Sequence, residues 1–538
     1  MKRFLGILLW VAWSLHATAQ VNFTESSLPI VVILTSNAQE IPDEPKIPAN
    51  MGIIYNGPGQ VNRLSDPWNE FQGTVGIERR GATSQQLFPK FPYAIELRDA
   101  SGDDISAPLL GMPKESDWAL ISNYNDKSLI RDALAYTLAG SVMSYAPRCR
   151  FVEVVINNQY QGIYLLTERI KRDNNRVDLK KNDPAKDPSG GYILKLDKEE
   201  GDSVIGYWTS HVKPYHSDQQ IRFLYHYPRT EDLVPAQKQY LQNWMYTLEE
   251  NLRSPGFAHP ATGYRKYLDP ATFIDFMWVN EAAKNIDGYR LSTFFYKDRD
   301  SIDGRLKMGP VWDFNLAFGN CNYCSGETTY GWMWDFNQVC GQDYWVIPFW
   351  WERLRQDTNF LIEAQQRWKN LRAGPLSDQN VEFRIDSLAA VLAGGPRSRN
   401  FQRWPVLGEW VWPNNFVGAT YEQELDYLKD WLRERLHWMD NATMGLYTGT
   451  YQPAGFFAPR VLPNPARGAT RIEFYAEAGA QISGVLYDVQ GHEIKRFTES
   501  VKAHNKQSYD LTLPAAAGVY FLQLDLEKQR YLRQVVVH

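Results

Sequence analysis

Alternating apolar and polar positions dominate the first part of the chain and predict β-strands. VGIER and YAIEL flank the polar stretch GATSQQ, which is typical of two half-buried strands joined by a loop. FVEVVI and GIYLLTERI, joined at Asn157-Asn158-Gln159, predict a β-hairpin. A strand is expected over residues 28–36, and the Pro-, Asn- and Gly-rich stretch from there to about residue 66 is expected to be irregular.

The apolar spacing changes to a helical period from about residue 235. Asp269-Pro270 is a start signal for a helix over ATFIDFMWVNEAAKN, and further helices are expected near residues 349–372, 379–393 and 419–439. An earlier helix is expected over KSLIRDALAYTLAGSVM, with Asn125 or Asp126 as its N-cap. LSTFFYKD and RLKMGPVWD lie inside the helical half and predict a hairpin.

The last eighty residues have a different pattern. Short strands such as TRIEFY, GVYFLQLDL and RYLRQVVVH recur about every ten residues between Gly- and Pro-containing turns. This spacing is typical of a small β-sandwich. The chain is therefore expected to hold a large mixed domain, β-rich first and helical later, followed by a separate all-β domain.

Composition and charge narrow the class of protein. The chain has 538 residues, of which 44% are hydrophobic, and a formal net charge of −5, so a large core is expected and no basic field favours nucleic acid as a partner. Lys2 and Arg3 precede the apolar run FLGILLWVAW and a small-residue site at Ala17-Thr18-Ala19, which predicts a signal peptide over residues 1–19. No later run predicts a transmembrane segment in the mature chain.

Four cysteines are present, and three of them, Cys321, Cys324 and Cys340, are spaced C-x2-C-x15-C. In an exported chain this spacing allows one or two disulfides. A zinc site with Cys149 or a histidine as fourth ligand, or free thiols, are the alternatives. In each case the cluster would fix the segment that follows Asp313.

Two aspartates lie in apolar or aromatic surroundings that make burial of an unpaired carboxylate costly. Asp287 follows the helical run FIDFMWVNEAAKN, and Asp313 lies between Trp312 and Phe314 in GPVWDFNLAFG. Such residues are usually paired, metal-bound, or carry a shifted pKa. The sequence therefore predicts that the two aspartates form the centre of a phosphoryl-transfer site.

Several motifs resemble one family in order along the chain, over roughly residues 70–440. RRGATSQQLFPKFPYAIEL, LGMPKESDWALISNYNDKSLIRDALAYTLA, VVINNQYQGIYLLTERI, and NIDGYRLSTFFYKD with GPVWDFNLAFGN are similar to segments of the CotH-like, spore-coat kinase-like proteins. The resemblance implies an α+β, atypical protein-kinase-like two-lobed domain. It also implies a phosphotransferase that uses ATP with Mg²⁺ or Mn²⁺ and acts on Ser or Thr hydroxyls of an exported protein.

The resemblance implies a role for each acidic-site residue. Asp313 would bind the metal together with Asn315, a position where some members of the family carry a second aspartate. Asp287 would be the catalytic base or would position the acceptor, with Asn285 and Ser292 as possible auxiliaries. For each of these residues the alternative interpretation is a turn former or a local cap.

The same resemblance assigns nucleotide and phosphate contacts to the first strand pair. Lys90 would contact phosphate, and Arg80 and Ser84 would hold phosphate oxygens by charge and hydroxyl. Glu168, at the end of GIYLLTE, would pair with the Lys90 ammonium. Exposed hairpin residues and a surface charge at a strand end are the alternatives, because a loop with only Gly81 is a weak phosphate signal.

The C-terminal segment resembles the sorting domain of type IX secretion, through Pro463-Asn464-Pro465, Gly518-Val519-Tyr520 and the terminal valines. It implies export through the periplasm to a secreted or outer-membrane surface location in Bacteroidetes-type bacteria, with the type IX machinery as a partner. The expected organisation is a signal peptide at 1–19, an N-terminal strand and irregular segment at 20–66, the kinase-like domain at 67–445, a linker at 446–457 and an all-β sandwich at 458–538.

A second hypothesis is a catalytically inactive kinase-like scaffold on the cell surface, used for adhesion or glycan binding. It is favoured by the 19 tryptophans and by asparagine rather than aspartate at position 315. Binding of ATP with a metal would distinguish the two hypotheses.

Overall fold

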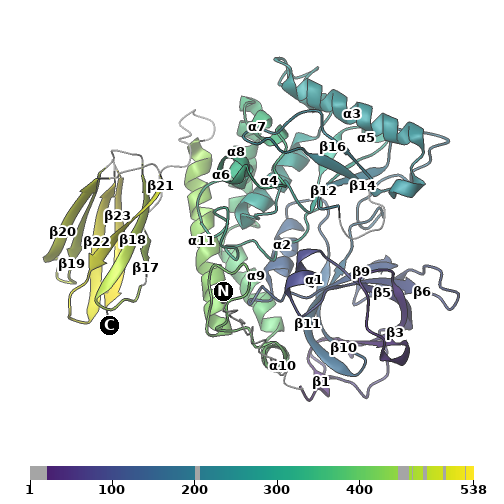
Figure 1. Ribbon diagram of the computed structural model, residues 1–538, viewed down its shortest axis with the longest axis horizontal. Coiled ribbons are helices and arrows are strands. Elements are labelled where there is room, and N and C mark those ends of the chain that lie inside the picture. Colours follow the sequence, from purple (N-terminus) through teal and green to yellow (C-terminus); the bar gives the residue numbers. More distant parts are fainter. Residues whose placement is uncertain are drawn as a thin grey trace, which may run out of the picture. The chain divides into compact units, whose positions relative to one another are not determined.

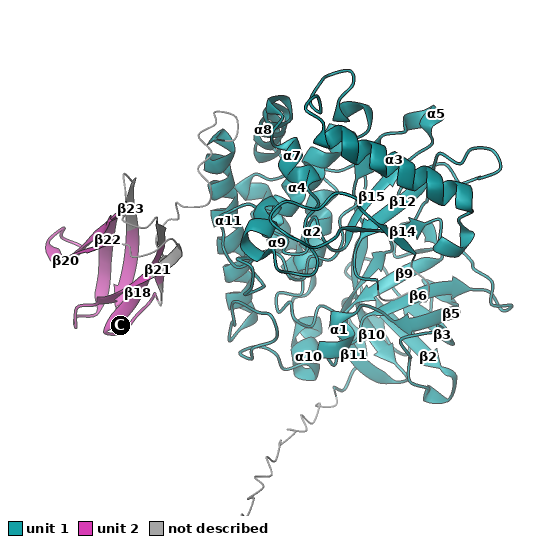
Figure 2. Ribbon diagram, turned by 45° about the horizontal axis from the view of Figure 1, so that its top comes forward, with its two compact units in different colours: residues 1–447 teal, residues 448–538 magenta. Residues whose placement is uncertain are grey.

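The structure, a computed structural model, describes residues 21–199, 206–445, 460–462, 464–476, 481–500, 505–526 and 529–537. The chain divides into two compact units, residues 1–447 and 448–538 (Figure 2). Helices and strands both occur in unit 1, and the described residues of unit 2 form strands, which confirms the α+β prediction with a C-terminal all-β part. The predicted signal peptide and the predicted linker lie outside the described residues.

A closed barrel forms the N-terminal part of unit 1. Its strand order is β10-β11-β9-β6-β5-β3-β2, and β10 closes the ring by pairing in parallel with β2 (Figure 1). Alternate residues of these strands, such as Val75, Ile77, Ile95 and Leu97, fill the interior. The strands are β2 (Ile30–Thr35), β3 (Ile47–Ile54), β5 (Phe71–Arg79), β6 (Tyr93–Arg98), β9 (Asp117–Ile121), β10 (Cys149–Ile156) and β11 (Gln159–Glu168).

One expectation for this region is wrong. The segment expected to be irregular up to residue 66 contains β3, which pairs with both β2 and β5 and completes the barrel. Its sequence IPANMGII hides the strand because proline and two small residues break the apolar alternation. The predicted β10–β11 hairpin is confirmed, with left-handed backbone at Asn157 and Asn158 in the turn.

A second, five-stranded sheet has the order β13-β14-β12-β15-β16. The predicted hairpin over LSTFFYKD and RLKMGPVWD is confirmed as the antiparallel pair β15–β16. Helix α3 lies along this sheet in both ribbon views (Figures 1 and 2), with the Lys297 ammonium over two of its rings. These elements are β12 (Tyr192–Leu196), β13 (Tyr207–Thr209), β14 (Arg222–Tyr227), α3 (Pro235–Arg253), β15 (Thr293–Lys297) and β16 (Leu306–Met308).

Helices form most of the remaining part of unit 1. In α4 the Asp269 carboxylate accepts the Ala271 N–H, and Pro270 occupies the first turn, as the sequence predicts. The predicted helix 349–372 is divided at Asp357, whose carboxylate caps the second part. The helices are α1 (Thr83–Leu87), α2 (Arg131–Ala139), α4 (Pro270–Ala283), α5 (Asp300–Asp303), α6 (Phe336–Cys340), α7 (Trp350–Leu354), α8 (Thr358–Arg372), α9 (Asp378–Val391), α10 (Gly395–Arg403) and α11 (Tyr421–Gly445).

Helix α2 begins later than its apolar pattern predicts. Leu129 has a left-handed backbone conformation, so the helix cannot extend back through it. Asp126 still acts at this end, because its Oδ2 accepts the Arg131 N–H at 2.8 Å and its Oδ1 forms a buried ion pair with the Arg131 guanidinium. The short elements of unit 1 are β1 (Glu25–Ser26), β4 (Asn62–Arg63), β7 (Ala107–Leu109), β8 (Met112–Glu115), and 3-10 turns at Ser36–Ala38, Thr230–Asp232, Tyr264–Lys266 and Met333–Asp335.

Unit 2 consists of a three-stranded sheet, β17-β18-β21, and a four-stranded sheet, β20-β19-β22-β23. Inward residues of both sheets, among them Ile472, Leu511, Leu486 and Leu522, form one apolar cluster, so the two sheets pack as the predicted β-sandwich. The strands are β17 (Arg460–Leu462), β18 (Ala469–Ala476), β19 (Gln481–Tyr487), β20 (Glu493–Ser500), β21 (Asn505–Thr512), β22 (Gly518–Leu526) and β23 (Gln529–Val537).

Candidate functional site

A cavity of about 490 Å³ in unit 1 brings together segments that are far apart in the sequence. Its walls come from the β5–α1 turn, the segment after β9, the end of β12, the segments after α4 and β16, and loops near residues 343 and 412. Six of the predicted site residues line it: Arg80, Ser84, Asp287, Ser292, Asp313 and Asn315. The acidic residues and the β5–α1 turn therefore line one cavity.

Asp313 lies five residues after β16, in a backbone conformation that is rare for a residue with a side chain. Its φ is +64°, in the left-handed region. Its N–H donates to the Tyr136 hydroxyl at 3.3 Å, and its C=O accepts from the Asn285 amide at 3.4 Å. Side chains of other segments therefore hold the backbone of this residue in place.

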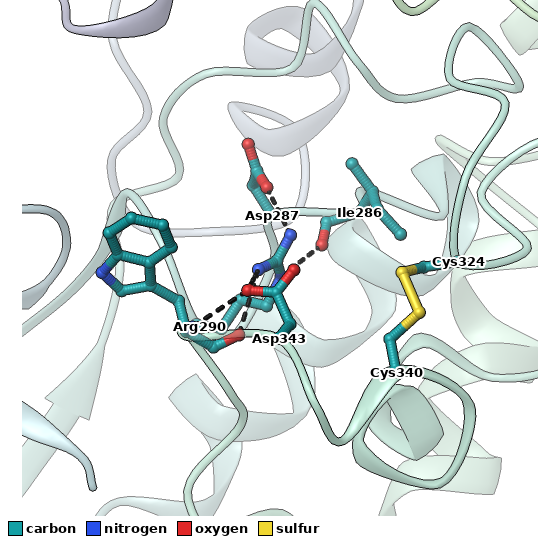
Figure 3. Close-up of a disulfide and its surroundings, with 7 residues drawn as sticks. Ile286, Asp287, Arg290, Cys324, Cys340 and Asp343 are labelled. Atoms are coloured by element: carbon teal, nitrogen blue, oxygen red, sulfur yellow. Dashed lines mark hydrogen bonds and ion pairs between the residues drawn. A yellow bond between two sulfur atoms is a disulfide. The ribbon is translucent and has the colours of Figure 1, made fainter. Parts of the chain in front are cut away.

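Asp287 lies four residues beyond the end of α4 and forms an ion pair with Arg290 (Figure 3). The guanidinium donates to Asp287 Oδ1 at 2.8 Å, to the Trp345 C=O at 3.0 Å and to the Ile286 C=O at 2.8 Å. It also lies 3.3 Å from Asp343 Oδ1. The side chain of Arg290 is 2% exposed, so this network fixes the direction of the Asp287 carboxylate.

A disulfide between Cys324 and Cys340 fixes the loop that completes this network (Figure 3). Tyr323, just before Cys324, lines the cavity, and the Asp343 N–H donates to the Cys340 C=O. The disulfide alternative from the sequence is therefore confirmed for one pair, and Cys149 and Cys321 are free thiols.

Replacing both Cys324 and Cys340 with serine is expected to lower the free energy of unfolding of the full-length protein by about 3 kcal/mol, because the covalent loop no longer restricts the unfolded chain. Denaturant titration with and without a reductant measures this difference. Cys149→Ser is the control, since that thiol forms no disulfide. Equal stability of the double variant and the wild-type protein would contradict the expectation.

Three carboxylates of the cavity act on one another: those of Asp197, Asp287 and Asp313. Burial, then the nearby charge of Asp287, raises the pKa of Asp313 to about 6, although Arg80 acts in the opposite direction. Burial also raises the pKa of Asp287, while Arg290 and then Lys198 lower it. Asp197 raises the pKa of both aspartates. Repulsion among these carboxylates favours a bound cation.

Two basic groups, one after a barrel strand and one after β12, line the same cavity. Arg80 follows the last residue of β5 and precedes Gly81, whose φ of +83° starts the turn into α1. Its guanidinium lies over the Trp312 ring, and its charge interacts with Asp313. The Lys198 ammonium, just after β12, donates to Thr83 Oγ1 at 2.7 Å. Arg80 and Lys198 are therefore placed to contact an anionic ligand near the two aspartates.

Two predicted phosphate-site residues do not line the cavity. The Lys90 ammonium is buried and donates to the Ile163 C=O at 2.5 Å and to Asn400 Oδ1 at 3.1 Å, which attaches α10 to the barrel. Burial holds the pKa of Lys90 well below its usual value. Glu168 is fully buried and pairs with Arg148 and Arg176, not with Lys90. The expected Lys90–Glu168 pair is therefore wrong.

The remaining predicted residues support the site in different ways. Asn285 is buried outside the cavity lining, where its Oδ1 accepts the Asp287 N–H and its amide donates to the Asp313 C=O. Asn315 lines the cavity but donates its amide to Asn125 Oδ1 at 3.0 Å. Ser292 also lines the cavity, with a left-handed φ of +45°. Asn285 thus links the two acidic segments without facing the ligand space.

Sequence reasoning missed several wall residues. Asp197 and Lys198 follow the strand GGYILKLD, and the position of these charges at a strand end is the signal that could have indicated them. Arg290 lies one helical turn after Asp287 in NIDGYR, a spacing that indicates a pair. The aromatic walls, including the stacked rings of Tyr323 and Trp412, come from loops without any sequence pattern.

Comparison with known protein families agrees with both resemblances. A family model described as CotH kinase protein matches residues 77–439, and one described as secretion system C-terminal sorting domain matches residues 460–538. A comparison with curated proteins gave no match. The sorting domain points to secretion or surface association through the type IX machinery. No helix in the described part of the chain is both long and apolar enough to cross a membrane. Since the first match covers more than half of its length, the chain belongs to the CotH kinase family.

Proposed function

We propose that this protein is an exported, metal-dependent protein kinase that transfers the γ-phosphoryl group of ATP to Ser or Thr hydroxyls of another exported protein. The observation that carries the proposal is the meeting of Asp287 and Asp313 with Arg80 and Lys198 in one cavity. Carboxylates for a metal and a proton, and cations for phosphates, are the parts that phosphoryl transfer requires. The barrel and the helical part of unit 1 would act as the two lobes.

The cavity residues fit a divalent cation and its nucleotide. Asp197, Asp287 and Asp313 repel one another, and Mg²⁺ or Mn²⁺ bound beside them would relieve this repulsion. Among the described residues no group of three acidic, His or Cys side chains is arranged to hold an ion. Asp313 would therefore hold the metal together with phosphate oxygens, a ligand set that suits Mg²⁺. Bound there, the metal would neutralise charge on the phosphate oxygens.

The chain's own groups would perform the remaining steps. Arg80 and Lys198 hold phosphate oxygens, and Ser84 offers a hydroxyl beside them. Asp287 takes the proton from the acceptor hydroxyl, and the oxygen of that hydroxyl forms a bond to the γ-phosphorus. The bond from that phosphorus to the bridging oxygen breaks, and ADP leaves. Burial raises the pKa of Asp287, which makes its carboxylate a stronger proton acceptor, and Arg290 keeps it oriented.

Incubation of the purified protein with γ-labelled ATP, Mn²⁺ and co-secreted proteins tests the proposal. Label on Ser or Thr residues, located by mass spectrometry and absent when the metal is chelated, is the expected result. The absence of both transfer and ATP binding, with either metal, would overturn it. The same assay with labelled GTP and pyrophosphate identifies the phosphoryl donor.

The affinity for Mn²⁺ is expected to fall about tenfold for each pH unit below 6 and to level off above it, because a proton and the metal compete for Asp313. The sign follows from the pKa of Asp313, which burial raises to about 6, so the carboxylate binds a proton at a higher pH than an isolated aspartate does. Calorimetric titration at constant ionic strength measures the profile. An affinity that stays constant down to pH 4.5 would exclude Asp313 as the ligand.

A second candidate function is a surface scaffold that binds glycans. The observation in its favour is the aromatic edge of the cavity, where Trp412 is 37% exposed and stacks on Tyr323. Flat exposed rings of this kind suit sugar faces as well as nucleobases. Binding to a polysaccharide panel, without any binding of metal and ATP, would favour this function.

A further inference from the structure

Helix α2 contacts three consecutive residues of the acidic motif. The Tyr136 ring stacks on Trp312 at 5.9 Å, the Tyr136 hydroxyl accepts the Asp313 N–H at 3.3 Å, and Asp132 Oδ1 accepts the Phe314 N–H at 2.7 Å. Asp132 and Tyr136 are four residues apart and therefore share one face of the helix. This face is buried, with Asp132 1% exposed and Tyr136 2% exposed.

These contacts compensate for an unfavourable backbone. A residue with a side chain at φ +64° is less stable than in the right-handed region, by about 1–2 kcal/mol. Side chains of α2 hold Asp313 in this conformation, because the N–H groups of Asp313 and of the following Phe314 both donate to them. The Asn285 amide donates to the Asp313 C=O. Without the acceptors on α2, the segment is free to return to a more common conformation, and the Asp313 carboxylate then moves.

The helix is itself anchored on its other side. The Asp126 carboxylate accepts the Arg131 N–H and pairs with the Arg131 guanidinium, and both side chains are fully buried. The Asp126 segment also reaches the site, since the neighbouring Asn125 accepts the Asn315 amide. The start of α2 is therefore fixed relative to the same cavity wall.

We propose that Asp132 and Tyr136 are positioning residues, which hold Asp313 in its left-handed conformation and so place its carboxylate for metal binding. The consequence for catalysis rests on the proposed function, whereas the positioning of the Asp313 backbone by these two side chains does not. Burial and then the nearby charge of Asp313 raise the pKa of Asp132 to about 8. A neutral amide in its place keeps the same acceptor oxygen.

Three variants and one control test the role. Asp132→Asn keeps an acceptor for the Phe314 N–H, Asp132→Leu removes it, and Tyr136→Phe removes only the acceptor for the Asp313 N–H. Thr137→Ala is the control, since its side chain bonds to the Ala133 C=O within the helix. Hydrogen exchange of a peptide spanning residues 311–318, followed by mass spectrometry, reports on the two amides directly.

Amide exchange is expected to be about tenfold faster in Asp132→Leu and Tyr136→Phe, as for the loss of one hydrogen bond, and unchanged in Asp132→Asn and Thr137→Ala. The concentration of Mn²⁺ needed for half-maximal binding is expected to rise in the first two variants only. Should Asp132→Leu not fold, Tyr136→Phe carries the test, because it removes a single oxygen.

Unchanged exchange and Mn²⁺ binding in Tyr136→Phe would overturn the inference. Equal losses in Asp132→Asn and Asp132→Leu would do the same, since the charge of Asp132, rather than its acceptor oxygen, would then be required. Failure of the proposed function looks different: the wild-type protein would not transfer phosphate, while the exchange rates would still separate the variants.

Discussion

Phosphoryl transfer by Asp313→Ala is expected to be lower than that of the wild-type protein by a factor of about a thousand or more, equivalent to several kcal/mol of lost stabilisation by the metal. Alanine removes a carboxylate whose charge interacts with the proposed phosphate-binding Arg80, and no other acid can replace it from the same backbone position. Binding of Mn²⁺ should be lost together with activity. Calorimetry with Mn²⁺ and a labelled-ATP assay measure the two effects.

Asp43→Ala is the matched control, because Asp43 is an exposed carboxylate at the edge of the same cavity whose partner is Gln85. It changes the net charge equally and is expected to leave both measurements within about twofold, as usual for an exposed charge. Hydrogen exchange of the barrel strands confirms that each variant is folded. Full activity of Asp313→Ala would place the metal elsewhere and remove the basis of the proposed function.

Much of the fold follows from local sequence patterns. The β10–β11 hairpin and the start of α4 are encoded within a few residues, by an Asn-rich turn and by an Asp-Pro start signal, and both predictions are confirmed. Strand β3 could not be recognised in the same way. Its pairing with β2 and β5 buries a sequence with little strand propensity of its own, so the barrel decides its conformation.

The residues of the candidate site show the same difference between local patterns and long-range pairing. Asp287 and Asp313 stand out because carboxylates in apolar or aromatic sequence surroundings need a partner, and the structure places both in one cavity. Lys90 and Glu168 are expected at the site through the family resemblance, but their ammonium and carboxylate groups bind Asn400 and Arg148 instead of each other. A single sequence contains no signal for such pairings. It shows that a buried charge needs a partner and leaves the partner unidentified.

The second large effect is expected for Asp287→Asn, with a fall in kcat of about a hundredfold to ten-thousandfold, the range typical of a lost general base. Asparagine keeps an oxygen that accepts the hydrogen bond from Arg290 Nη2, so the local network should remain. It removes the group that accepts the proton of the acceptor hydroxyl. Binding of Mn²⁺ and of ATP should stay within about threefold of the wild-type values, in contrast to Asp313→Ala.

The acidic limb of the pH–rate profile gives a second, independent test of Asp287 as the general base. Because burial raises the pKa of Asp287, the rate should rise with pH over a range above that of an isolated aspartate, and this limb should disappear in Asp287→Asn. Asp343→Asn is the matched control, because Asp343 is the second carboxylate that pairs with the Arg290 guanidinium and the substitution removes one negative charge. It is expected to lower kcat by less than about tenfold, as a change in orientation alone would.

The contrast between the two aspartates assigns their roles. If Asp287→Asn kept its kcat at saturating metal but bound Mn²⁺ weakly, Asp287 would be a metal ligand and the proton would need another acceptor. Asp197 is the candidate in that case, because it also lines the cavity and its charge acts on both Asp287 and Asp313. If instead only kcat falls, the pair is divided as proposed: Asp313 for the metal, and Asp287, held by Arg290 and the disulfide-fixed loop, for the proton.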